Sequence, residues 1–199
     1  MAKYSTRLTL LEKIKNSHDE QSWEDFVHFY RHFIYSIIRK SHLPAEECED
    51  LSQVVLLRLW QALPKFDYDQ EKGGFRYWLY RVTQNVVNSE LKKQISRKEK
   101  FEQNYLPDAL MDSESKRQSD VEVWIESEWR IHISNLAYQN VLPQLSDKAR
   151  RAFEMFLDDV PVEEIAQEID IKVNSVYIYK NRVKEQIKAE IRHLKDQLE

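Results

Sequence analysis

The segment PVEEIAQEIDIKVNSVYIYKNRVKEQI, residues 161–187, decides the fold of the C-terminal part of the chain. It combines a short helical pattern with the small residue Ala166 at mid-length, a four-residue turn and a longer basic helical pattern. Asp170 falls where the turn is expected to need a left-handed backbone, which Asp adopts more readily than most residues. This order predicts a helix-turn-helix. The simpler alternative is an amphipathic helical hairpin with a solvated charged face.

The last helix of this segment is expected to have one buried and one exposed side. At 100° per residue, the buried side carries Val176, Tyr179, Val183 and Ile187. The exposed side of the N-terminal half is where recognition helices touch base edges in the major groove, and it carries Tyr177, Ile178, Asn181 and Arg182. The lysines that could contact phosphates are Lys172, Lys184 and Lys188. Glu185 would repel phosphate, so we expect a short contact surface.

Helical periodicity extends over most of the remaining chain. The 199 residues include only two glycines and five prolines, which leaves few tight turns. We therefore expect an all-α protein, with helices at about 6–16, 22–41, 45–63, 75–98, 120–143, 147–159, 162–169 and 174–199. Ser22 and Ser146 are the predicted N-caps of two of these helices.

An acidic stretch divides the chain into two parts. Residues 102–119 lack periodicity and are rich in Asp, Ser and Glu, which is typical of a flexible linker. The sequence thus predicts two small helical domains, at 1–100 and 120–199, joined by a linker at 101–119. Residues 91–100 carry five Lys or Arg and one Glu, whereas residues 101–123 carry six Asp or Glu and two basic residues. This pattern indicates nucleic-acid affinity that is local and limited.

Composition restricts the class of protein further. The net charge of −4 argues against an independent nucleic-acid binder, which is normally basic. No apolar run is long enough to span a bilayer, and the N-terminus MAKYSTRLTLLEKIK lacks the features of a signal peptide. The single cysteine, Cys48, excludes an internal disulfide and a multi-cysteine zinc site. We expect a cytoplasmic protein without membrane insertion.

In DLSQVVLLRLWQAL, residues 50–63, apolar residues cover most of the helix circumference. Such a helix is either buried on all sides or partly covered by a partner. The polar residues at its start form the expected exposed patch, which consists of Asp50, Ser52 and Gln53.

The stretch GGFRYWLYRVTQN, residues 73–85, begins with the only two glycines of the chain. Its expected core stripe consists of Leu79, Val82 and Val86, with Trp78 close by. The other side carries Tyr77, Tyr80, Arg81 and Gln84, and continues into Lys92 and Lys93. Aromatic rings beside arginines favour single-stranded nucleic acid, because bases stack on the rings while cations follow the backbone. The alternative is that most of these rings fill the core.

Together, DLSQVVLLRLW, KFDYDQEKGGFRYWLYRVTQNVV and VEEIAQEIDIKVNSVYIYKNRV resemble regions 2 and 4 of bacterial sigma-70-type factors. The two-domain length resembles the extracytoplasmic-function (ECF) group of that family. The resemblance implies a promoter-recognition subunit of RNA polymerase that is neither an enzyme nor a cofactor-binding protein. Its first implied partner is core polymerase, which it would contact at the clamp coiled coil of the largest subunit and at the flap. The second is promoter DNA, both duplex and single-stranded, and an anti-sigma factor is a further candidate.

The resemblance also assigns residues. Asp50 and Gln53 match polar contacts to the clamp, although Val54 stands where the family often has an acidic residue. The loop FDYDQEKGG matches the segment that captures a flipped base of the minus-ten element. The implied minus-ten residues are Tyr68, Tyr77, Trp78, Arg81, Asn85, Lys92 and Lys93. The implied minus-35 residues are Lys172, Ser175, Tyr177, Ile178, Asn181, Arg182 and Lys184. Lys180 stands where the family usually has a core aliphatic residue.

Two rival interpretations stay open at this point. An independent helix-turn-helix regulator would bind duplex DNA without polymerase, usually as a dimer, but it leaves the apolar helix and the aromatic helix unexplained. Glu24, His28 and His32 share one helix face at a spacing that can hold a metal. A second helix that supplies ligands is missing, and the sequence has no HExxH glutamate, nucleophile elbow or phosphate loop, so we expect no metal site and no enzyme.

Overall fold

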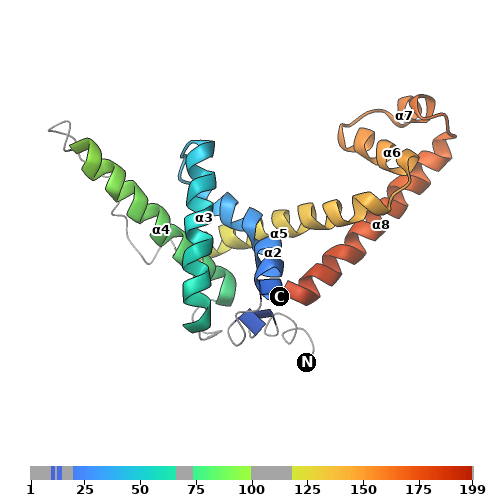
Figure 1. Ribbon diagram of the computed structural model, residues 1–199. Helices are drawn as coiled ribbons and strands as arrows, with labels where there is room; N and C mark the ends of the chain where they lie inside the picture. The colour runs from blue at the N-terminus through green and yellow to red at the C-terminus, as the bar shows by residue number, and fades with distance from the viewer. Residues whose placement is uncertain (1–9, 12, 15–19, 66–73, 100–117, 199) are drawn as a thin grey trace. The chain divides into compact units, whose positions relative to one another are not determined.

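The described residues are organised into helices. The computed structural model describes residues 10–11, 13–14, 20–65, 74–99 and 118–198. Within these ranges the regular elements are α-helices and short 3-10 helices, without a β-strand, which confirms the all-α prediction (Figure 1). Their contacts form two compact units, one ending at Trp129 and the other beginning at Arg130. Most of the predicted helix at 6–16 and nearly all of the predicted linker at 101–119 lie outside the described residues.

The first unit packs three long helices around an aromatic core. They are α2 (Glu20–Arg39), α3 (Ala45–Ala62, followed by the 3-10 helix η1, Leu63–Lys65) and α4 (Gly74–Glu99). Phe26 stacks on Tyr30 with ring centroids 4.8 Å apart, and Phe75 of α4 meets both rings edge-on at 6.1 and 5.4 Å. Residues from all three helices are buried around these rings, among them Phe33, Ile34, Ile37, Val55, Leu59 and Leu79. The core therefore fixes α3 and α4 against α2.

The start of α2 differs from the sequence prediction. The helix already begins at Glu20, so Ser22 lies inside it, and the Ser22 side chain is buried. The predicted N-cap at Ser22 is thus wrong, because the position faces the core. At the other end, α2 stops at Arg39. The chain then turns at His42, whose backbone is left-handed with φ of +57°, and Pro44 stands directly before α3.

The second unit contains the helix-turn-helix. After α5 (Gln118–Val141) and the 3-10 helix η4 (Leu142–Gln144) come α6 (Asp147–Leu157), α7 (Val162–Glu168) and α8 (Val173–Leu198). Figure 1 shows α6 and α7 against the N-terminal half of α8. The Ser146 side chain accepts a hydrogen bond from the Ala149 amide at 3.4 Å, which confirms the predicted cap. Asp170 has φ of +51°, as predicted for the turn between α7 and α8.

The first half of α5 packs into the first unit. Trp129 is fully buried, with its ring 5.6 Å from Tyr30 and 5.2 Å from Phe33. Trp124 contacts Tyr80 of α4 at 5.9 Å between centroids. The division between the units therefore falls at Trp129 and Arg130, and not at residue 120.

Candidate nucleic-acid interface

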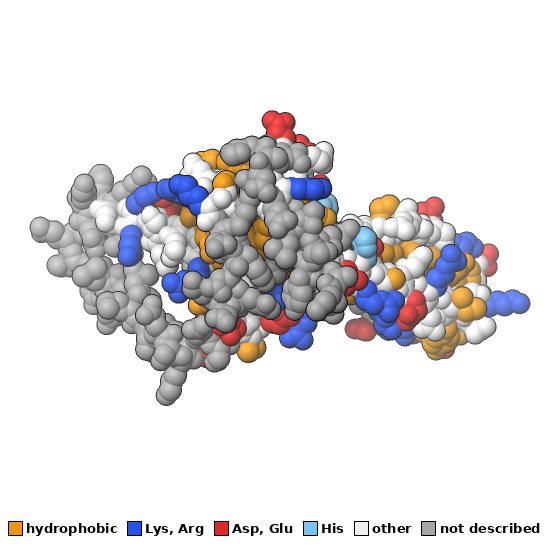
Figure 2. Space-filling model, turned by 90° about the horizontal axis from the view of Figure 1, so that it is seen from below, with side chains coloured by type: hydrophobic (Ala, Val, Ile, Leu, Met, Phe, Trp, Pro, Cys, Tyr) orange, Lys and Arg blue, Asp and Glu red, His pale blue; other side chains and the backbone are white. Residues whose placement is uncertain are grey.

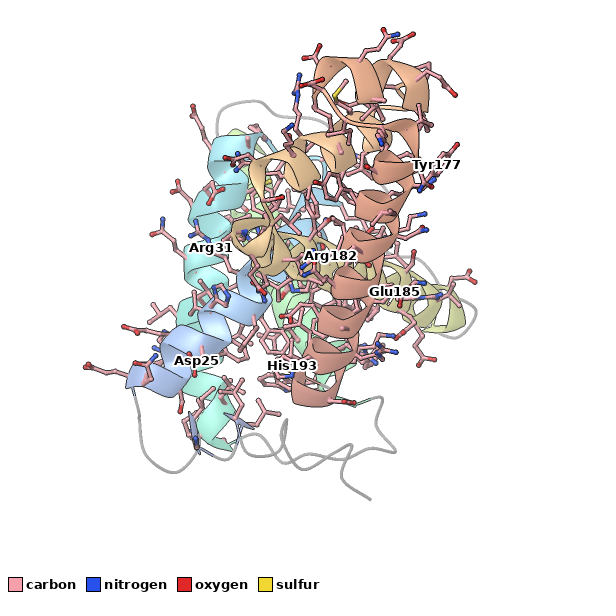
Figure 3. All side chains as sticks on the ribbon, turned by 90° about the vertical axis from the view of Figure 1, so that its right-hand side faces the viewer. Asp25, Arg31, Tyr177, Arg182, Glu185 and His193 are labelled. Atoms are coloured by element: carbon pink, nitrogen blue, oxygen red, sulfur yellow. The ribbon has the colours of Figure 1, made fainter. Side chains whose placement is uncertain are left out.

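The N-terminal half of α8 has an exposed face. Tyr177 and Ile178 are 45% and 57% exposed, although both are large and hydrophobic. The other exposed residues of the set predicted to contact the duplex are Lys172, which directly precedes α8, and Asn181, Arg182 and Lys184 on the helix, whereas Ser175 is half-buried. Figure 3 shows Tyr177, Arg182 and Glu185 at successive levels along α8. Sequence reasoning missed Val173, which is 40% exposed in the first turn of α8.

The opposite face of α8 is held by α6 and α7. Val176 and Val183 are buried, at 1% and 0% exposed, in two apolar clusters that also contain Ile165 of α7 and Phe153 of α6. Tyr179 and Ile187 pack against these clusters, so the predicted buried side of α8 is confirmed. Because this face is fixed in the core, the face carrying Ile178 and Asn181 is left on the outside.

The charge of Lys180, a half-buried residue, is paired with an aromatic ring. The Lys180 ammonium lies 3.6 Å from the centroid of the Phe156 ring, and the Lys184 ammonium lies 5.4 Å from the same centroid. A cation over an aromatic face is attracted by the quadrupole of the ring. The contact lets a lysine occupy a half-buried position at the edge of the core.

Glu185 is an acidic residue among the basic residues of α8. Its carboxylate accepts a hydrogen bond from the Lys188 ammonium at 2.8 Å, which lowers the pKa of Glu185, and the charge of Lys188 lowers it further. The group therefore stays negative at neutral pH. On the side of this unit visible in Figure 2, basic side chains are interspersed with acidic and hydrophobic ones instead of forming one continuous surface.

The buried stripe of α4 differs from the predicted one. Phe75, Leu79, Thr83 and Val87 are fully buried, whereas Val82 and Val86 are only half-buried. Thr83 was not part of the predicted stripe; its hydroxyl donates to the Leu79 carbonyl at 2.9 Å, so its polar group is satisfied although it is buried. The helix is consequently rotated relative to the expected orientation.

In this orientation, two aromatic residues of α4, Trp78 and Tyr80, pack against other rings of the first unit. Tyr80 packs on Trp124, and burial raises the pKa of its phenol. Trp78 is half-buried, with its ring 5.6 Å from that of Phe75. Both rings therefore serve packing at least in part, as the alternative interpretation expected.

The remaining predicted residues of α4 form an outward face. Arg81, Asn85, Lys92 and Lys93 are exposed and Tyr77 is half-buried. The Lys93 ammonium lies 3.1 Å from Glu90, whose carboxylate shields part of the positive charge. Tyr68 and the loop around it lie outside the described residues.

Gly74 starts α4 with a backbone that favours glycine. Its φ is +69°, and a Cβ built there would meet no atom within 4 Å. Glycine is therefore needed for the backbone conformation, and not because another part of the protein approaches closely.

The exposed side of α3 is partly apolar. Asp50 and Gln53 are exposed as predicted, and they are followed by Val54 and Leu57, which are 44% and 58% exposed. Ser52 contradicts the prediction, because it is buried and its hydroxyl donates to the Cys48 carbonyl at 2.8 Å. The expected patch thus lacks Ser52 but continues along the helix through Val54 and Leu57.

A groove of about 360 Å³ runs between α3 and α4. Its lining contains apolar side chains from both helices and several polar ones, namely Val54, Arg58, Ala62, Val82, Asn85, Val86, Ser89, Glu90 and Lys93. The groove therefore connects the apolar side of α3 with the outward face of α4. Sequence reasoning missed this groove because lining residues such as Arg58 and Ser89 belong to no recognisable sequence motif.

The three residues of the metal-site alternative lie in the described part of the chain. No group of three or more His, Cys, Asp or Glu side chains is placed there to hold an ion, although Glu24, His28 and His32 are all described. Among the described helices, none is both long enough and apolar enough to cross a membrane.

Comparisons with known proteins match segments of both helical units to sigma-70 family models. The family model "Sigma-70 region 2" matches residues 26–97, and "Sigma-70, region 4" matches residues 135–187. The chain is 24% identical over 187 residues to the ECF RNA polymerase sigma factor SigW of Bacillus subtilis (strain 168). The aligned region covers 88% of this chain and 92% of that relative. The solved structure of CnrH in complex with the cytosolic domain of CnrY covers 94% of this chain and 98% of that one, at 14% identity and a TM-score of 0.37.

The two family matches fall in the expected order, one in each helical unit, and together they span more than half of the chain. An independent helix-turn-helix regulator would account for the second match only. The chain therefore belongs to the sigma-70 family, as an ECF sigma factor that acts in promoter-specific initiation of transcription.

Proposed function

We propose that the exposed sides of α3, α4 and α8 divide the work of a sigma factor among polymerase binding, strand capture and duplex recognition. The observation that carries the proposal is that each helix buries one side in its own unit and leaves a chemically distinct side uncovered. Sigma factors are non-enzymatic regulators of RNA polymerase, so binding alone must supply the effect. The proposed place of action is the cytoplasm, where the polymerase works.

In this proposal α3 binds the clamp coiled coil of the largest polymerase subunit. Asp50 and Gln53 supply polar contacts, and Val54 and Leu57 supply an apolar area that water would otherwise cover. Val54, which stands where the family often has an acidic residue, would thus contribute a hydrophobic contact in place of a polar one. An anti-sigma factor that covered the same side of α3 would compete with polymerase.

The outward face of α4 then binds the unpaired non-template strand at the minus-ten element. Extruding a base from the duplex costs a few kcal/mol, and a protein compensates for this only by binding the open strand better than the closed one. Tyr77 offers a ring for stacking, Arg81 and Lys92 offer charge, and Asn85 offers hydrogen bonds. Tyr68 is proposed to act with them from the preceding loop.

The exposed side of α8 reads the minus-35 element in the major groove, while the second unit also contacts the polymerase flap. Lys172 and Lys184 serve as phosphate contacts, which position the helix but carry no sequence information. Base-edge contacts come from the residues between them, in particular Asn181 and Arg182.

The test uses purified core polymerase and run-off transcription on genomic fragments. Leu57→Asp should abolish co-purification with core, because a charge would replace the apolar contact. Asn85→Ala should retain core binding but lower open-complex formation at least tenfold, as expected when hydrogen bonds to a captured strand are lost.

Two variants serve as matched controls. Val123→Asp changes another exposed apolar residue, 69% exposed, and should leave core binding intact. Asn135→Ala removes an exposed asparagine from α5 and should leave open complexes intact. Equal losses of core binding for Leu57→Asp and Val123→Asp would contradict the role of α3. Parallel losses of core binding and melting in Asn85→Ala would contradict the role of α4.

A further inference from the structure

The exposed side of α8 has a hydrophobic centre. Ile178 is 57% exposed and Tyr177 is 45% exposed, and Val173 at the start of the helix is 40% exposed. The same helix buries Val176 and Val183 almost completely, so apolar residues on its outside are not needed for the fold. Hydrophobic groups gathered on the exposed side of a helix indicate a contact surface.

Ile178 lies at the middle of this side. At 100° per residue it points away from Val176 and Val183, which face the core. One turn earlier stands Asn174 and one turn later stand Asn181 and Arg182, all of them exposed. The helix therefore presents one branched aliphatic side chain between two amides, with a guanidinium beyond.

These groups match particular base edges in the major groove. Thymine alone carries an apolar group there, its C5 methyl, whereas adenine offers a donor and an acceptor that suit Asn, and guanine offers two acceptors that suit Arg. An aliphatic side chain at the centre of the exposed side of α8 makes a favourable apolar contact with a methyl group. Against any other base edge it would cover polar groups without offering them a hydrogen bond, which costs free energy.

We infer that Ile178 reads the C5 methyl of a thymine at the centre of the minus-35 element, so that this element is built around A·T pairs. The inference rests on the proposed role of α8 and adds the identity of the base. Asn174 and Asn181 are assigned to adenines on either side, and Arg182 to a guanine beyond them.

The length of the element follows from the charges on α8. Lys180 is directed to the Phe156 ring, and Glu185 keeps a negative charge that phosphate would repel. The readable stretch thus runs from Val173 to Arg182, which is about 14 Å at 1.5 Å per residue. Base pairs are spaced about 3.4 Å apart, so this stretch covers about four of them.

The test removes single methyl groups from the promoter. The minus-35 element is first mapped by run-off transcription with the reconstituted holoenzyme. Each thymine in it is then replaced, one at a time, by deoxyuridine, which keeps base pairing and lacks only the C5 methyl. Loss of one buried methyl corresponds to about 0.8 kcal/mol. One central position should therefore reduce transcript yield at limiting holoenzyme about fourfold.

Two substitutions connect this effect to the proposed residue. Ile178→Ala should make the deoxyuridine template and the thymine template equally active. Ile131→Ala changes an isoleucine of similar exposure, 53%, on α5, and should retain the fourfold difference. Ile178 is exposed, so its replacement leaves the core of the unit intact.

Three outcomes would overturn the inference. They are a minus-35 element without thymine, deoxyuridine templates that are all fully active, and an Ile178→Ala protein that keeps the fourfold difference. In each of these the holoenzyme still initiates at discrete sites, so the proposed function stands. A holoenzyme that gives no discrete start sites would refute the proposed function itself.

Discussion

Lys180 is half-buried because its ammonium lies over an aromatic ring instead of in bulk water. The neighbouring Lys184 lies farther from the same Phe156 ring, at 5.4 Å against 3.6 Å. The attraction falls with this distance, so the two lysines differ in what they contribute to the second unit. A lysine in a core-edge position is thus explained by one partner on α6.

We expect the Lys180–Phe156 contact to contribute about 0.5–1 kcal/mol, the range for a cation over a ring at a partly exposed site. A double-mutant cycle with Lys180→Met and Phe156→Leu, followed by urea denaturation, measures this coupling. The same cycle with Lys184→Met is the matched control and should give a smaller coupling. Equal couplings for the two lysines would contradict the geometric explanation.

Among the elements, α5 shows how one helix serves two cores. Its first half carries Trp124 and Trp129, and both rings pack on residues of the first unit. Cations accompany the rings: the Lys40 ammonium lies 4.0 Å from the Trp124 centroid, and burial lowers the pKa of Lys40. The guanidinium carbon of Arg76 lies 5.3 Å from the centroid of the Trp129 ring, and a guanidinium nitrogen of Arg76 lies 3.3 Å from a carboxylate oxygen of Glu126. Residues 118–129 lie outside both family matches, yet they complete the core of the region 2 unit.

Trp129→Ala should destabilise the first unit by about 3–5 kcal/mol, the usual cost of removing a buried tryptophan side chain. Hydrogen exchange locates the effect: amides of α2 and α4 should exchange faster, while those of α6 and α7 stay protected. Ile131→Ala, an exposed position on the same helix, should change neither set. Loss of protection confined to α6 and α7 would show that Trp129 belongs to the other core.

At the scale of the whole molecule, the net charge and the placement of the basic side chains disfavour DNA binding by the chain alone. The net charge is −4, and the basic side chains of the face seen in Figure 2 are separated by other types. Two weak DNA-binding units gain affinity when a third body holds them at the correct spacing, because the second contact then becomes intramolecular. Polymerase is the proposed third body.

The free chain should therefore bind a minus-35 duplex only weakly at about 0.15 M salt, in the range above about 1 µM that is typical of non-specific contacts. The holoenzyme should bind the same promoter far more tightly. Fluorescence anisotropy on a labelled promoter fragment compares the two directly. Tight, sequence-specific binding by the chain alone would favour an independent regulator instead.

The helix-turn-helix and the cap at Ser146 were predictable because their causes are local. Ser146 caps its helix and Asp170 adopts the left-handed turn as expected, since both depend on residues a few positions away. Exposure of Ile178 and Asn181 followed from helical periodicity against a valine stripe. Ser22 and Ser52 were misjudged because a hydroxyl that bonds within its helix, or faces the core, can be buried, and polarity alone does not reveal this.

The sequence by itself determined that the chain is helical, where its helices lie, which sides of α8 are buried and exposed, and to which family it belongs. These properties arise from periodicity, capping and motif residues that act within one or two turns. Only the tertiary structure decided the rotation of α4, the placement of Lys180 over Phe156 and the docking of Trp129 beside Tyr30 and Phe33. Each of these depends on which side chain arrives from a distant helix, and packing against that neighbour outweighs the local pattern.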